Sequence, residues 1–135
     1  MTHPLQPVLA GEHAAMWVLS FVGGRVSRSA SPELADAVTA AYRIHRGRRD
    51  QLTLLIRDAG EEPVAAEVAY QAPSAQTSEQ IRAAALAIEV STAALYGEAI
   101  AATEGADRSW AVRALLDAAV RQLGFGGVPE ATPGL

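Results

Sequence analysis

Three ionisable residues fall at positions where helical periodicity predicts the interior of the protein. Glu12, His45 and Glu89 each stand in the middle of a segment that has apolar residues at i±3 and i±4 spacing. Carboxylate and imidazole side chains can together bind a metal such as Fe, Mn or Zn, or they can neutralise one another as ion pairs. Because a buried charge is costly without such a partner, we expect these three groups to lie close together.

Further polar residues are expected to join these three. Tyr42 lies three residues before His45 and Arg49 four residues after it, so both share its side of a helix. The Arg49 guanidinium would then neutralise the inward carboxylates. Asp117 is the candidate from the last apolar segment, at the edge of an expected inner ridge of Val112, Leu116, Val120 and Leu123. The predicted polar core cluster therefore comprises Glu12, Tyr42, His45, Arg49, Glu89 and Asp117.

Apolar periodicity and turn signals predict an all-α chain in which four helices position these residues. Ser31 before Pro32 is a helix-start signal, Gly60 is a helix-end signal, and Asp107 is expected to cap the last helix. The segment after Gly60 is too long for a simple turn and can travel the length of a bundle, whereas the other connections are short. The helices are expected at about 7–26, 32–59, 77–103 and 107–123.

Composition limits the classes of protein to which the chain can belong. Its 135 residues fit one domain, with the bundle expected over 1–124 and a loosely packed Gly- and Pro-rich tail over 125–135. The net charge of −4 indicates no nucleic-acid partner, and the absence of cysteine excludes disulfides and thiolate metal sites. Without a secretory leader pattern or an uninterrupted apolar span, we expect no membrane association and a cytoplasmic location.

Three stretches resemble a known group of helical proteins. They are LAGEHAAMW, HRGRRDQLTLLIRDAG and AAALAIEVSTAALYGEAI, and together with the long connection they are similar to the ferritin-like superfamily of four-helix bundles. More narrowly, the chain resembles an uncharacterised, alanine-rich ferritin-like family of high-GC bacteria. The resemblance covers nearly the whole chain and implies a ferritin-like four-helix bundle with its long connection between the second and third helices.

The metal-binding members of that superfamily use one Glu on each of helices 1 and 3, and Glu-x-x-His on helices 2 and 4. By this resemblance Glu12 and Glu89 match the lone glutamates and His45 matches the first histidine. The glutamate expected three residues before His45 is Tyr42, however, and on the last helix the nearest candidate, Asp117, is followed three residues later by Val120. Both two-residue motifs are therefore broken.

Three interpretations follow from the broken ligand set. The favoured one is a structural relic that needs no cofactor, in which His45 and Arg49 neutralise Glu12 and Glu89. The alternative is a metal-dependent redox or oxygen-handling protein that holds Fe or Mn through Glu12, His45 and Glu89. In the third, these side chains face solvent or a subunit interface.

The sequence does not assign the protein to one functional class. Ser and Thr residues within the helices have no adjacent base, so no catalytic residue is assigned and a non-enzymatic role is favoured. An apolar chain with Trp and Phe available for a contact surface favours association as a homodimer. A small-molecule pocket beside the polar cluster is a further possibility, with no ligand indicated, and His13 is expected at a contact between helices.

Overall fold

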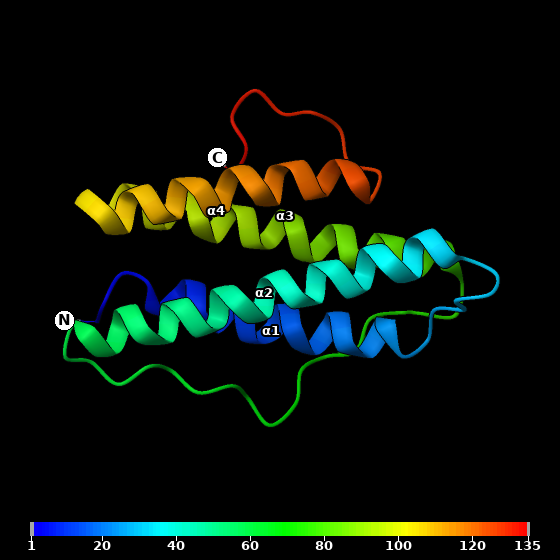
Figure 1. Ribbon diagram of the computed structural model, residues 1–135, viewed down its shortest axis with the longest axis horizontal. Helices are drawn as coiled ribbons and strands as arrows, with labels where there is room; N and C mark the ends of the chain where they lie inside the picture. Colours follow the sequence, from blue (N-terminus) through cyan, green and yellow to red (C-terminus); the bar gives the residue numbers. More distant parts are fainter. Residues whose placement is uncertain (1, 135) are drawn as a thin grey trace.

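The computed structural model describes residues 2–134, and these fold into four helices without a β-strand (Figure 1). The helices are α1 (Gln6–Gly23), α2 (Pro32–Asp58), α3 (Ser78–Ala102) and α4 (Gly105–Gly124). The prediction of an all-α four-helix bundle is confirmed.

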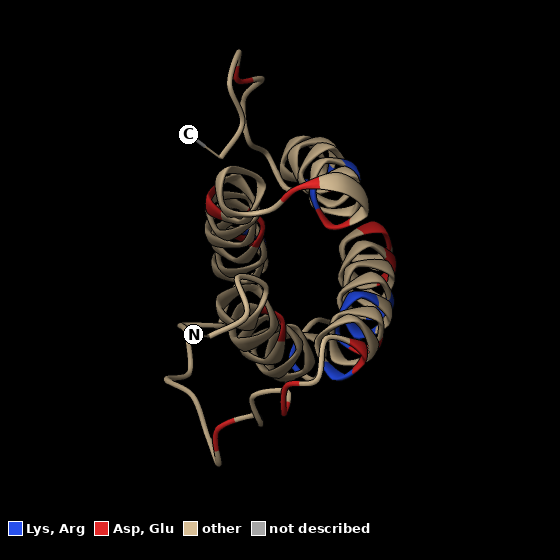
Figure 2. Cartoon of the chain, turned by 90° about the vertical axis from the view of Figure 1, so that its left-hand side faces the viewer, with Lys and Arg blue, Asp and Glu red and all other residues tan. Residues whose placement is uncertain are grey.

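The order of packing follows from the lengths of the connections. α1 packs along α2, α3 packs along both α1 and α4, and α2 makes little contact with α3. The connection between α2 and α3 runs back along the outside of the bundle, so that α3 starts at the end opposite to where α2 stops (Figure 1). Seen along their axes, the helices surround a common centre (Figure 2). The predicted long connection is therefore what sets the directions of α3 and α4.

Most helix ends agree with the local sequence signals, and three differ. Thr77 accepts a hydrogen bond from the Gln80 amide at 3.1 Å and caps α3, and Gly60 beyond α2 has a φ of +84°. α1, however, ends at Gly23, before the expected Val26. Ser31 contributes no side-chain cap to α2. α4 begins at Gly105, which places Asp107 in the first turn of the helix and corrects its prediction as the cap.

Two apolar clusters form the core at opposite ends of the bundle. Glu12, His45 and Glu89 are fully buried between the two clusters along their helices. The first cluster contains Leu5, Val8, Leu9, Leu52, Ile56, Tyr96, Ala99, Ala111 and Ala114. The second contains Leu19, Val22, Leu34, Val38, Ala41, Ala75, Ile81, Ala85 and Phe125. A polar layer therefore crosses the middle of the bundle.

α4 faces the bundle with its small residues, contrary to prediction. Its buried residues are Ala111, Ala114, Ala118 and Gln122. The expected inner ridge is exposed instead, with solvent-accessible fractions of 37% for Val112, 57% for Leu116, 67% for Val120 and 45% for Leu123. Alanine lets α4 approach its neighbours closely, and that arrangement turns the bulky residues outward.

The segment after α4, for which a loosely packed tail is expected, contacts the bundle at two places. Phe125 is 2% exposed and belongs to the second apolar cluster, so the core extends one residue beyond the predicted boundary. Gly134 lies against α3, where a Cβ atom would come within 2.4 Å of the Ala93 carbonyl oxygen. Parts of the tail therefore pack on the bundle.

α3 is long and apolar enough, by length and composition alone, to cross a membrane. In this fold the helix lies between α1 and α4 and carries the buried Glu89 near its middle. A helix that is buried in the centre of a bundle has the same apolar composition, and α3 occupies such a central position in this fold.

Candidate functional site

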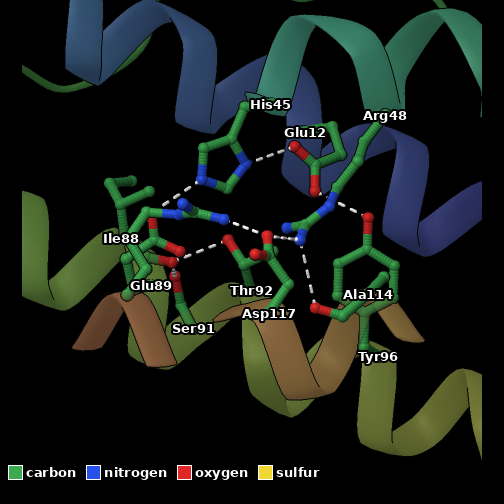
Figure 3. Close-up of polar contacts among 11 residues, drawn as sticks. Glu12, His45, Arg48, Ile88, Glu89, Ser91, Thr92, Tyr96, Ala114 and Asp117 are labelled. Carbon is green, nitrogen blue, oxygen red and sulfur yellow. Dashed lines mark hydrogen bonds and ion pairs between the residues drawn. The ribbon is translucent and has the colours of Figure 1, made fainter. Parts of the chain in front are cut away.

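The polar layer is centred on His45, which lies between two carboxylates from neighbouring helices (Figure 3). Its Nδ1 lies 2.5 Å from Glu12 Oε2 of α1, and its Nε2 lies 2.9 Å from Glu89 Oε1 of α3. All three side chains have no exposed surface. The structure thus brings together three of the residues in the predicted cluster, and the interpretation that they face solvent is wrong.

The ionisation of His45 depends on these neighbours. Burial lowers the pKa of its imidazole, but the hydrogen bonds and negative charges of Glu12 and Glu89 outweigh burial and raise this pKa from 6.5 to about 9. At neutral pH the ring therefore carries both protons and a positive charge. It donates one hydrogen bond to each carboxylate.

Tyr96 and Arg121 complete the contacts of the two glutamates. The Tyr96 hydroxyl donates to Glu12 Oε1 at 2.8 Å, and burial together with the Glu12 charge holds the pKa of this phenol well above 10. Arg121 Nε of α4 lies 3.2 Å from Glu89 Oε1, an ion pair without a directed hydrogen bond. Each glutamate therefore contacts His45 and one further side chain, Tyr96 for Glu12 and Arg121 for Glu89.

Arg48 and Asp117 form the outer part of the layer. Arg48 pairs with Asp117, donates from Nη2 to the Ala114 carbonyl oxygen at 3.2 Å, and lies over the Tyr96 ring at 5.5 Å. Asp117 also pairs with Arg121, although its own side chain is 46% exposed. The layer then contains three acidic groups, Glu12, Glu89 and Asp117, and three basic groups, His45, Arg48 and Arg121. It is electrically balanced when His45 is protonated.

The structure does not bring two of the predicted residues into this layer. Arg49 lies toward the surface and pairs with Asp50 at 2.8 Å, so the prediction that Arg49 neutralises Glu12 and Glu89 is wrong. Tyr42 is also outside the layer, with the guanidinium of Arg46 6.0 Å from the centre of its ring. Both residues line a surface pocket of about 250 Å³ near the connection, together with His13, whose Nε2 contacts the Val64 carbonyl oxygen at 3.0 Å.

Sequence reasoning missed Arg48 and Arg121, and a stricter use of the heptad would have found the first. Buried positions on α2 alternate by four and three residues from Leu34 through Val38, Ala41 and His45 to Arg48 and Leu52. Arg121 carries one local signal, an i,i+4 relation to Asp117. Its inward position depends on the rotation of α4 about its axis. The bulky apolar residues of α4 predict the wrong rotation, because they face outward.

The carboxylates of the layer are arranged on either side of His45 and not around one common point. Within residues 2–134, no group of three or more His, Asp or Glu side chains is placed to hold a metal ion. Glu12 and Glu89 approach opposite nitrogens of His45 and therefore do not converge with a free imidazole lone pair on one point. Two guanidinium groups also supply positive charge to the layer: Arg121 stands beside Glu89, and Arg48 pairs with Asp117.

Comparison with known proteins gives a family and a fold. A family model described as a domain of unknown function, DUF4439, matches residues 4–135. Among solved structures, the chain is similar to the crystal structure of a conserved hypothetical protein, rv2844, from Mycobacterium tuberculosis. The TM-score is 0.82 and the sequence identity 26%, over 90% of this chain and 91% of that chain. No curated protein matches the chain.

Proposed function

Because the chain belongs to the DUF4439 family, a domain of unknown function, we propose a role from the geometry of its core. We infer that the protein is a ferritin-like bundle in which a charge network has replaced a di-metal site, and that it acts in the cytoplasm without catalysis, through association as a homodimer. The observation that carries the proposal is the engagement of both His45 nitrogens by carboxylates.

Two features support the ferritin-like origin. The helices follow one another as two antiparallel pairs joined by a connection that runs the length of the bundle, as the one-crossover ferritin topology requires (Figure 1). Glu12 and Glu89 also occupy corresponding inward positions on α1 and α3. Arg48 and Arg121 supply the positive charge that bound metal ions would otherwise provide.

Metal content tests this part of the proposal. Protein purified from cells supplemented with iron and manganese is expected to contain far less than one metal atom per chain by elemental analysis, because the histidine nitrogens are protonated and paired. Glu89→Ala is expected to leave the content as low as the matched variant Glu98→Ala, which removes an exposed carboxylate from the same helix. One metal per chain that is lost only in Glu89→Ala would instead establish the metal-dependent redox alternative.

The exposed apolar stripe of α4 supports the homodimer. Val112, Leu116, Val120 and Leu123 lie on one side of the helix, and Leu116, Val120 and Leu123 border a surface groove of about 230 Å³ that Val128 and Pro129 complete. An exposed stripe of this length on a helix is typical of a contact surface. Two copies related by a two-fold axis can cover it with the same residues from each side.

Sedimentation equilibrium tests the association. The wild-type protein is expected to be a dimer at micromolar concentration, and Leu116→Glu is expected to be a monomer because it places a charge at the centre of the stripe. Leu54→Glu is a matched control, since Leu54 is 60% exposed on α2, away from the stripe, and this variant is expected to remain dimeric. A monomeric wild-type protein, or a dimer that survives Leu116→Glu, contradicts the proposed surface.

A further inference from the structure

A surface pocket lies between α2 and α4, beside Arg48. It has a volume of about 250 Å³ and is lined by Arg48, Gln51, Trp110, Arg113 and Ala114. α2 and α4 are joined at this point by side chains: Arg48 reaches the Ala114 carbonyl oxygen, and Trp110 Nε1 donates to Gln51 Oε1 at 3.1 Å. The pocket therefore has walls held in place by cross-helix hydrogen bonds.

The lining supplies positive charge and hydrogen-bond donors. Arg48 has a side chain only 8% exposed and pairs with Asp117, and its Nη1, which has no partner among the residues described, is buried behind the wall of the pocket. Arg113 makes no ion pair within residues 2–134. None of the five lining residues carries a carboxylate. The acceptors on the wall, the Ala114 carbonyl and Gln51 Oε1, already receive hydrogen bonds from Arg48 and Trp110.

Such a wall recognises an oxygen-rich anion. Guanidinium groups form paired, charge-assisted hydrogen bonds with carboxylate and phosphate oxygens, and these bonds strengthen where the donor is shielded from water. The ring of Trp110 adds an aromatic flank to the pocket. The volume is somewhat below that of pockets for drug-sized ligands, which run from roughly 300 Å³ upward, and so favours a small ligand.

We propose that the seam between α2 and α4 binds the carboxylate or phosphate group of a small molecule, with the exposed Arg113 as its anchor. This inference does not depend on the proposed metal-free or dimeric character of the protein. It depends only on the contacts of Arg48, Gln51, Trp110 and Arg113.

Trp110 provides a direct reporter for this pocket. The chain has two tryptophans, so Trp17→Phe leaves Trp110 as the sole indole. Titration of this variant with inorganic phosphate and, separately, with acetate at constant ionic strength is expected to change its fluorescence to saturation for at least one of the two anions. Whichever anion saturates identifies the chemical group that the pocket prefers. Calorimetric titration of the wild-type protein provides the same measurement without the Trp17 substitution.

Arg113→Gln tests the anchor with little risk to the fold, because Arg113 is exposed. It is expected to weaken binding roughly 10- to 100-fold by removing a charge-assisted contact. Arg108→Gln is the matched control, since it removes the same charge from α4 outside the pocket and is expected to bind as the parent protein does. The proposal is overturned if neither anion saturates, if chloride produces the same change, or if the two variants respond alike.

Discussion

His45→Leu is expected to lower the free energy of unfolding by roughly 3–5 kcal/mol at pH 7, as measured by urea denaturation. The substitution removes the positive charge between Glu12 and Glu89, and both carboxylates have no exposed surface. Glu12 then keeps only the Tyr96 hydroxyl, while Glu89 keeps only its ion pair with Arg121. Since a domain of this size is stable by about 5–15 kcal/mol, the loss is a large fraction of the total.

A histidine-to-leucine substitution at an exposed position is the control for His45→Leu. It measures the effect on stability of losing a histidine outside the buried network. His13→Leu removes one exposed contact with the Val64 carbonyl and is expected to cost less than about 1 kcal/mol. Adding Glu12→Gln to His45→Leu is expected to recover part of the loss, because the stranded charge is gone. Equal effects of His45→Leu and His13→Leu would show that the charge network contributes nothing particular to stability.

Stability is expected to fall as the pH rises from about 6.5 to about 9. The folded protein holds the His45 proton up to about pH 9, whereas an unfolded histidine releases it near 6.5. Within this window the folded state binds more protons than the unfolded state, so the free energy of unfolding decreases with pH. The stabilisation is complete below pH 6.5 and amounts to roughly 3 kcal/mol before it is lost. Urea denaturation in steps between pH 6 and pH 9, at constant ionic strength, measures this slope.

The pH dependence of the free energy of unfolding can be assigned to His45 by comparing the wild-type protein with His45→Leu. His3, His13 and the terminal amine are shared by the wild-type protein and His45→Leu, so subtracting the two pH profiles removes their contributions. The difference is expected to shrink steadily above pH 6.5. Measurements stay below the range in which Tyr96 ionises, since the pKa of that phenol lies well above 10. Parallel profiles for the two proteins would contradict a proton held by His45.

Capping and turn residues in the sequence were sufficient to predict the helices, but not to predict every contact between the helices. Thr77 and Gly60 mark real helix boundaries because capping and a left-handed backbone are decided within a few residues. Arg48 and Arg49 show the limit of such signals. Both lie about one turn beyond His45, yet one is buried against Tyr96 and the other pairs with Asp50 at the surface. A difference of one residue rotates a side chain by about 100°, so the phase of a helix must be fixed by its whole ridge.

The sequence by itself determined the number of helices, their approximate bounds, the long connection and the inward positions of Glu12, His45 and Glu89. Apolar periodicity and turn residues encode these features locally. Only the tertiary structure decided that Arg121 reaches Glu89, that the alanines of α4 face inward while Leu116 and Val120 face out, and that Phe125 belongs to the core. The reason is physical: the rotation of a helix depends on which face its neighbours can approach most closely, and that choice is made by helices distant in the chain.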